Sequence, residues 1–552
     1  MSIQKLILAA LLSLACVPPS FAGQIPLSLK TDVPGVEYSE AIPMPESILG
    51  HRIGHSHTRP DQIVRYFEAV AAASDRVIVE RHGSTYEERP LLHAIVTSSE
   101  NRLRLEQLRE CIVIIDPMLN PDGRARFVDW VNGNRGRVAT SDPNDREHRE
   151  PWPGGRTNHY WFDLNRDWLP VQLKESQGRL QLFYHWRPQL VTDFHEMGGN
   201  STFFFMPGVA SRTNPLTPQS NFDLTRRIAA FHARYLDRLG SLYYSEEGYD
   251  DYYYGKGSTY PDINGAIGIL FEQASSRALK REVADGVLDY AFTIRNQFTA
   301  SLSSLDAAVT LRHDLLAQQR DFYRDALGQA RLSPIKGWLF DARDCGGRIH
   351  PLIETLLRHQ IRIYPLARDL QVGDRTFPAG HAYIAPVLQP QTRLLQALME
   401  RVTDPEETVF YDVSTWTFPL AFNVDTVELR TDPQPYLGPR IGGPTRSEGR
   451  VEGTGEPYAY LMDWNNHRAP AALFALQEAG VRTRLLTRSI AYGQGADLVR
   501  FDRPMIVVPV HQQPLEASPS RNPRSHCCVV RGRAAVKSGR AGSSSTSVKG
   551  FP

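Results

Sequence analysis

Two side chains that could take part in acid–base or metal chemistry stand at the ends of short apolar runs. His195 follows the run at 190–194, and Glu272 follows the run at 266–271. Such runs, alternating with helical patterns, predict a largely parallel sheet, whose ligands lie at the carboxyl ends of its strands. Each residue alone is weak evidence, because single histidines are mostly structural and a carboxylate at a strand end often caps a turn.

Other polar groups add to this pair. Asn165 and Arg166 offer a forked set of donors of the kind that binds carboxylates with two hydrogen bonds. His195 is followed by a glutamate, but Gly199 stands where an HExxH zinc motif needs its second histidine. A cluster of histidines, without carboxylates beside it, is a further candidate metal site: His51, His55 and His57.

The first part of the chain must supply the elements that position these residues. Apolar spacing and turn signals predict helices at 61–73, 98–110, 175–186 and 221–247, and strands at 77–79, 91–96, 111–115, 190–194 and 266–271. The strand at 111–115 is expected to end in a turn at Asn120-Pro121-Asp122-Gly123. Residues 132–160 predict a long loop, and such loops in compact domains are usually functional.

A second α/β region follows a helical connector at 293–331. It contains two strand–helix–strand patterns without a catalytic cluster: 337–340, 349–359 and 361–366, then 459–462, 469–479 and 481–486. No acidic residue occurs from residue 517 onward, and this composition indicates a disordered or frame-shifted tail. The predicted division is 1–22 signal peptide, 23–60 extended lead-in, 61–325 first domain, 333–516 second α/β domain and 517–552 tail.

Composition and the N-terminus limit the partners and the location. The chain has 552 residues, and its 62 Lys and Arg nearly balance its 61 Asp and Glu, so charge gives no reason to expect nucleic acid as a partner. Lys5, an apolar run at 6–16 and small residues before Ala22 predict a signal peptide and an exported, secreted or periplasmic protein. Cys16 leaves a lipoprotein signal as the alternative. No stretch reaches the length of a transmembrane helix.

Five motifs occur in a recognisable order over roughly residues 60 to 300. They are Asn-Pro-Asp-Gly at 120–123, Arg135, Asp-Leu-Asn-Arg at 163–166, Asp-Phe-His at 193–195 and Phe-Glu at 271–272. Together they resemble the zinc carboxypeptidases of the carboxypeptidase A type, most of all a bacterial branch with an extra C-terminal α/β domain similar to an amidotransferase domain. The resemblance implies a mostly parallel mixed sheet flanked by helices, and a second, truncated α/β domain.

The resemblance also implies roles for individual residues. His195 matches the third zinc ligand, and Glu272 matches the general base that deprotonates a zinc-bound water. Arg135 stands at the spacing of the arginine that stabilises the oxyanion.

The same resemblance implies a substrate. Asn165 and Arg166 match the pair that grips the substrate's C-terminal carboxylate, and Tyr254 matches the mobile tyrosine over the substrate. The implied partners are therefore peptide or protein C-termini, and the implied cofactor is zinc.

One departure from the family pattern concerns the metal. The family takes its first two zinc ligands from a His-x-x-Glu motif before the strand that ends in Asn-Pro-Asp-Gly, and this sequence has no such motif there. A strand–helix unit of roughly 30 residues is missing with it, which predicts a sheet without a central strand. Catalytic zinc needs three protein ligands. His93, on an earlier strand, is the conceivable substitute ligand.

Three hypotheses follow for the function. The first is a zinc metallocarboxypeptidase that removes C-terminal residues from peptides. The second is a non-catalytic relative that still binds peptide C-termini. The third is the product of a damaged gene, with an internal deletion and a frame-shifted tail.

Overall fold

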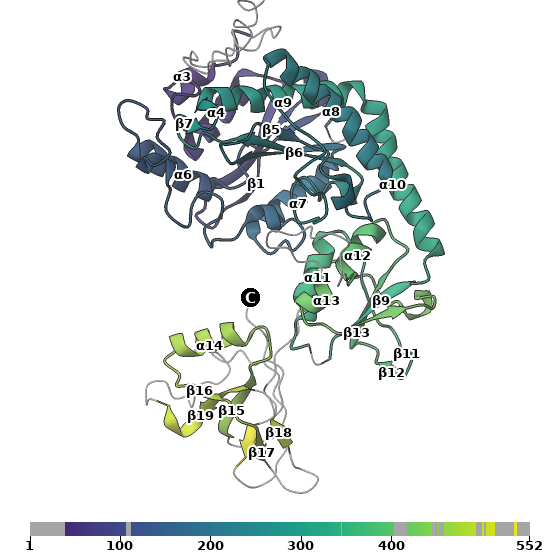
Figure 1. The fold of residues 1–552 in the computed structure, drawn as a ribbon. Coiled ribbons are helices and arrows are strands. Elements are labelled where there is room, and N and C mark those ends of the chain that lie inside the picture. The colour runs from purple at the N-terminus through teal and green to yellow at the C-terminus, as the bar shows by residue number, and fades with distance from the viewer. Residues whose placement is uncertain are drawn as a thin grey trace, which may run out of the picture. The chain divides into compact units, whose positions relative to one another are not determined.

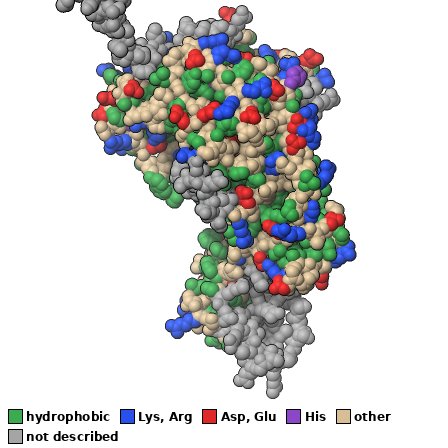
Figure 2. All heavy atoms as spheres, turned by 45° about the vertical axis from the view of Figure 1, so that its right-hand side comes forward, with side chains coloured by type: hydrophobic (Ala, Val, Ile, Leu, Met, Phe, Trp, Pro, Cys, Tyr) green, Lys and Arg blue, Asp and Glu red, His purple; other side chains and the backbone are tan. Residues whose placement is uncertain are grey.

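The computed structural model describes residues 39–105, 112–343, 345–401, 417–443, 445, 451, 457–492, 499–501, 504–513 and 535–537 (Figure 1). The signal peptide predicted for 1–22 lies outside them, as does most of the tail. The described residues divide into two compact units, one up to Ala326 and one from Leu327. Figure 2 shows acidic and basic side chains interspersed over the face that it displays.

The first unit contains two three-stranded sheets. One is antiparallel, in the order β1-β2-β3: β1 (Val77–Ser84), β2 (Pro90–Val96) and β3 (Val113–Ile115). The other has the order β4-β6-β5: β4 (Leu190–Met197), β6 (Ile267–Ala274) and β5 (Phe203–Phe205). Strands β4 and β6 are parallel, whereas β5 runs antiparallel to β6.

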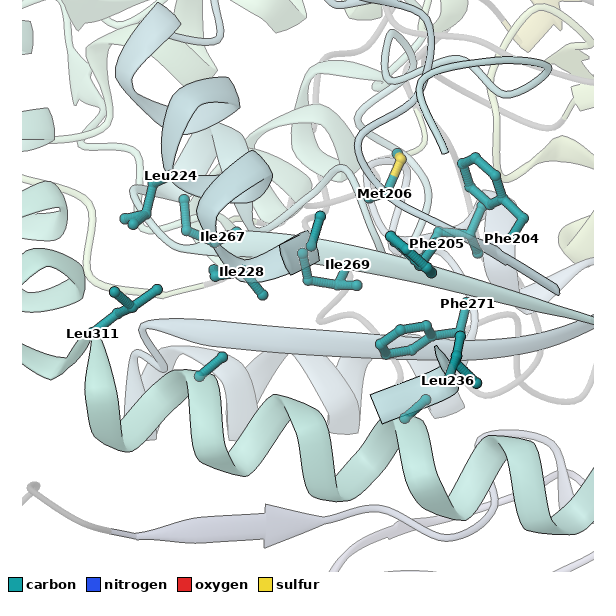
Figure 3. Packing of buried hydrophobic residues seen from close by; sticks show 14 of the residues in the cluster. Phe204, Phe205, Met206, Leu224, Ile228, Leu236, Ile267, Ile269, Phe271 and Leu311 are labelled. Carbon is teal, nitrogen blue, oxygen red and sulfur yellow. The ribbon is translucent and has the colours of Figure 1, made fainter. Parts of the chain in front are cut away.

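Helices surround these sheets. Their bounds are α3 (Pro45–Leu49), α4 (Pro60–Ala73), α5 (Ser99–Arg102), α6 (Pro121–Asn134), α7 (Lys174–Trp186), α8 (Gln219–Leu239), α9 (Tyr290–Thr310) and α10 (Arg312–Leu332). One apolar core joins β5 and β6 to α8, α9 and α10 (Figure 3). Ile267, Ile269 and Phe271 alternate along β6 and enter this core, and the other face of β6 carries Gly268, the core residue Leu270 and a polar end. Glu272 belongs to that opposite side.

Several predicted elements are confirmed, and others need correction. Helices at 61–73 and 175–186 form as expected, whereas the helix predicted at 98–110 ends at Arg102. Both candidate-site strands form but continue to Met197 and Ala274, so His195 and Glu272 lie within them rather than at their ends. The predicted turn at 120–123 is wrong, because Asn120 is the N-cap of α6 and accepts a hydrogen bond from the Gly123 N–H at 3.0 Å. Asparagine at the N-cap followed by proline is a strong helix start. The helix predicted to reach residue 247 ends at Leu239, where Gly240 adopts a left-handed conformation.

The prediction of a mostly parallel sheet is also too broad. Among the described strands of the first unit, β4 and β6 form the parallel pair, and the remaining pairs are antiparallel. Short links explain the difference, because five residues join β1 to β2, whereas a parallel connection needs a crossover of a dozen or more. Among described strands, β3 pairs with β2 alone and β4 with β6 alone, and each carries a partly exposed apolar residue: Ile115 (41%) and Phe194 (40%).

The second unit contains the same motif twice. Its first half comprises β9 (Gly337–Asp341), α11 (Ile349–Arg358), β10 (Tyr364–Pro365), a hairpin of β11 (Leu370–Val372) and β12 (Arg375–Phe377), β13 (Ala382–Pro386), α12 (Thr392–Met399), α13 (Phe418–Ala421) and β14 (Thr426–Leu429). Its second half comprises β15 (Pro457–Asp463), α14 (Ala469–Glu478), β16 (Arg484–Leu486), a hairpin of β17 (Ile490–Tyr492) and β18 (Val499–Phe501), β19 (Met505–Pro509) and β20 (Ala535–Lys537).

Strand order makes the repetition clear. The two sheets run β10-β13-β9-β14 and β16-β19-β15-β20. In the first half β13 lies between β10 and β9, and in the second half β19 lies between β16 and β15 in the same way. The strands of each predicted strand–helix–strand pattern are therefore parallel to each other, but an antiparallel strand separates them. In the part of the chain that the structure describes, no helix has the length and apolar character needed to cross a membrane.

A close contact behind β6 yields the first prediction. A Cβ on Gly268 would lie 1.6 Å from the carbonyl oxygen of Ser258, in the loop that also carries Gly257. We expect Gly268→Ala to lower the free energy of unfolding by about 3 kcal/mol, the upper end of overpacking effects, because backbone must move. Gly133→Ala, at an exposed position of α6, has open space around the new methyl group and is the matched control. Urea titrations of both variants test this, and equal stability would contradict it.

Candidate functional site

The register of β4 on β6 brings the two candidate residues together. His195 pairs directly with Glu272 in the parallel ladder, and Asp193 lies two residues earlier on the same face of β4. That face is turned away from the apolar core, so the three polar side chains share one environment. The sequence predicts both residues at strand ends, and the ladder instead pairs them within the two strands, two positions before the last pair of the register.

A hydrogen-bonded group forms around the buried carboxylate of Asp193. Its Oδ1 lies 2.9 Å from Nε2 of His195, and its Oδ2 accepts a hydrogen bond from Nδ2 of Asn165 at 3.1 Å. The same Asn165 nitrogen lies 2.7 Å from His195 Nε2. Asn165 is thus tied to the β4 side chains rather than turned toward a substrate.

Two loops hold Asn165 in this position. Asp163 caps the short 3-10 turn Leu164–Arg166 by accepting a hydrogen bond from the Asn165 N–H at 2.8 Å. From the other side, the Gly257 N–H donates to Asn165 Oδ1 at 2.7 Å. A Cβ on Gly257 would lie 2.7 Å from Asp193 Oδ2, so only glycine allows the loop this close.

The charges of the group shift its pKa values in opposite directions. Burial alone would lower the pKa of His195, but the charge and hydrogen bond of Asp193, with the charge of Glu272, raise it above 6.5. Burial would raise the pKa of Asp193, but His195 and Asn165 hold it below its usual value. Each group therefore favours the charged form of the other.

Glu272 is in a different state. Burial, above all, raises its pKa to about 7, and the charge of Asp193 adds to the rise while His195 opposes it. Its Oε2 is buried and accepts no hydrogen bond among the described residues. A carboxyl group with a pKa near neutrality can both take and give a proton, which is what general acid–base chemistry requires.

Arg156 acts on this site by its charge, and the sequence did not single it out. Its Nε donates to Asp163 Oδ2 at 2.9 Å, and its charge lowers the pKa of both His195 and Glu272. It lies in the loop 135–163, where no motif marks it. The role of Asp193 could have been found, because residues two apart on a strand share a face.

The remaining predicted site residues lie in other surroundings. Nη1 of Arg135 donates to the His55 carbonyl oxygen at 2.7 Å, and its charge acts on His57 and Glu147. Tyr254 is buried, with its hydroxyl 2.9 Å from Thr217 Oγ1, which does not suit a mobile tyrosine.

Arg166 remains near the site. It follows Asn165 and donates from Nη1 to the carbonyl oxygen of Asn165 at 2.9 Å.

The alternative histidine ligands are dispersed as well. His57 is buried between Phe127 and Tyr290, with ring centroids 5.2 and 4.2 Å away. His93 on β2 lies beside Glu80, with 3.6 Å between His93 Nε2 and Glu80 Oε2, and its ring is 5.5 Å from that of His82. Neither joins His195.

The donor set around His195 does not complete a zinc site. Asp193 occupies Nε2, which is how a carboxylate orients a metal-binding histidine, and this leaves Nδ1 for a ligand. The described residues, however, contain no group of three or more His, Cys, Asp or Glu side chains placed to hold a metal ion. We therefore derive no step through zinc.

Removing the carboxylate of the pair tests these electrostatics. In Asp193→Asn we expect the pKa of His195 to fall, because burial then acts without the charge that opposes it. Titration of the His195 ring by NMR measures the change, with Asp237→Asn on exposed α8 as the control. An unchanged titration of His195 would contradict the ion pair.

A second prediction concerns Glu272 and stability. Between its ordinary pKa of 4.5 and about 7, the folded chain keeps a proton that the unfolded chain has lost, so stability falls as pH rises through this window. Glu272→Gln should therefore unfold with a free energy on the order of 2 kcal/mol higher than wild type at pH 8, and with little difference at pH 4.5. Urea titrations at both pH values measure this. Glu282→Gln, on exposed β7 (Lys280–Val283), should show no such contrast.

Known structures provide an independent comparison. The chain resembles carboxypeptidase A from Helicoverpa armigera (14% identity, TM-score 0.32, 48% of this chain and 80% of that chain) and a metallo-carboxypeptidase from Pseudomonas aeruginosa (14%, 0.31, 47% and 70%). It also resembles thrombin activatable fibrinolysis inhibitor (11%, 0.31, 47% and 78%). No family model and no curated protein sequence matches. The resemblance to carboxypeptidases predicted from the motifs is confirmed as a resemblance, although TM-scores this low carry no conclusion about the site.

Proposed function

We propose that this chain is a carboxypeptidase-like protein that binds peptide C-termini at the site of His195 and Glu272 without hydrolysing them through zinc. The observation that carries the proposal is the state of His195. Its Nε2 lies 2.9 Å from Asp193 Oδ1, whose charge favours the protonated ring, and it lacks the partner ligands that zinc requires among the described residues. Its free ring nitrogen is then a donor for an anionic ligand.

The surrounding charges favour a carboxylate as that ligand. Arg156 adds a second positive charge that reaches both His195 and Glu272. Glu272 itself repels an anion only when it is ionised, and its protonated form can donate a hydrogen bond to a carboxylate. Binding of a peptide C-terminus is therefore coupled to protonation of Glu272.

A zinc metallocarboxypeptidase remains the alternative to this proposal. The feature that favours it is Glu272 itself, since its pKa of about 7 suits a general base next to a histidine that a carboxylate orients.

Export of the chain with cleavage after Ala22 remains part of the proposal, and mass spectrometry of the native protein tests it.

Binding of matched peptides tests the proposal. N-acetylated tetra-alanine with a free C-terminus should bind at least about tenfold tighter than its C-terminal amide, because only the free acid pairs with His195 and Arg156. Its affinity should fall between pH 6 and pH 8, as Glu272 loses its proton. Glu272→Gln should reduce that fall, whereas Glu282→Gln should leave it unchanged. Calorimetry measures these values, and equal binding of acid and amide would refute the assignment.

Hydrolysis separates the two candidates. The full chain, incubated with the same peptide and added zinc, should release no alanine. Release that depends on added zinc and is abolished in Glu272→Gln would establish the metallocarboxypeptidase instead.

A further inference from the structure

Large aromatic side chains are exposed on the loop that leads to Asn165 of the candidate site. Four of them lie within the loop between α6 and α7, with the following exposed fractions: Trp152 (74%), Tyr160 (54%), Trp161 (58%) and Phe162 (59%). Single exposed apolar residues are normal on a protein surface, but a contiguous group indicates an interaction site.

Two of these rings contact each other, and a third packs against neighbouring rings. The ring centroids of Trp152 and Trp161 are 4.7 Å apart and their planes are inclined by 55°. Tyr160 lies 4.7 Å from Tyr86 at 75° and 4.7 Å from His159 at 87°. The rings are thus inclined to one another rather than coplanar, which leaves ring faces and edges open between them.

A buried asparagine holds three of the rings outward. Asn158 is fully buried, and its Oδ1 accepts hydrogen bonds from the Tyr160 and Phe162 N–H groups at 3.0 and 3.1 Å. Its main chain is bonded to Phe162 and Trp161 in the same tight turn. The presentation of the aromatic residues is therefore built into the backbone.

Trp161 adds evidence of strain. Its φ is +67°, in the left-handed region that bulky residues rarely adopt. Such a conformation persists only where the surrounding structure enforces it, and strained residues of this kind cluster at binding sites. Here the strained backbone carries a tryptophan side chain that is exposed to solvent, although tryptophan side chains are usually largely buried.

The loop is continuous with the candidate site. Arg156 stands between Trp152 and Asn158 in the sequence, is bonded to Asp163, and acts electrostatically on His195 and Glu272. Phe162 is followed directly by Asp163 and the turn that carries Asn165. The loop that carries the aromatic residues therefore also carries Arg156, and it leads directly into the turn that holds Asn165 against His195.

We propose that Trp152, Tyr160, Trp161 and Phe162 form an aromatic platform that binds an aromatic or large apolar side chain upstream of the peptide C-terminus. This proposal rests on the proposed function, because it takes the C-terminal carboxylate to lie at His195. Inclined rings suit an inserted side chain, since aromatic groups prefer edge-to-face and offset contacts. A sugar ring, which needs one broad open ring face, fits this arrangement less well.

The test uses the full chain and three N-acetylated tetrapeptides derived from tetra-alanine. Each peptide keeps the C-terminal alanine and carries one phenylalanine at a different one of the three preceding positions. For wild type, at least one of these peptides should bind about three- to tenfold tighter than tetra-alanine. Trp161→Asn keeps a residue that tolerates positive φ and removes the ring. This variant and Trp152→Ala should abolish the gain while leaving tetra-alanine binding within about twofold. Phe474→Ala, an exposed aromatic residue on α14, is the matched control and should change nothing.

The outcomes separate the two proposals. If the acid binds better than the amide but no phenylalanine improves binding, the platform is refuted and the proposed function stands. If phenylalanine improves binding of acids and amides alike, and Trp161→Asn removes the gain, the platform stands and the carboxylate assignment falls. Binding of a β-1,4-linked N-acetylglucosamine tetramer that depends on Trp161, without a phenylalanine effect, would overturn the peptide assignment. Thermal unfolding of each variant confirms that the fold is intact.

Discussion

The carboxylate of Asp193 is buried within the first unit, and a buried charge is costly unless it is paired and hydrogen-bonded. His195 and Asn165 supply both forms of compensation. Asn165 in turn accepts from the Gly257 backbone and is held by the cap at Asp163. This contact therefore fixes two loops against β4, and it favours the protonated form of the histidine.

The same pair sets the character of Glu272. Burial raises the pKa of Glu272, and the charge of His195 lowers it only in part, so this pKa stays near 7. A site with one oriented histidine, one half-ionised glutamate and an adjacent arginine has the charges for binding a carboxylate. The ligands that zinc needs are not assembled among the described residues.

The sequence predicts the centre of this site well and its periphery poorly. His195 and Glu272 follow from strand patterns, because the carboxyl ends of adjacent parallel strands must meet. Arg135 and Tyr254 were placed by motif spacing alone, and spacing does not fix the path of a long loop. Arg156 belongs to that loop, and its position depends on the contact with Asp163. The aromatic residues depend on the buried Asn158, a tertiary constraint that periodicity does not encode.

Zinc binding tests the central claim most directly. The full chain, stripped with a chelator and titrated with zinc by calorimetry at pH 7.5, should show no binding of micromolar or tighter affinity that is lost in His195→Ala. Tight binding of one zinc per chain that disappears in His195→Ala would contradict the account, because it would mean that His195 has partner ligands and is neutral in the folded chain.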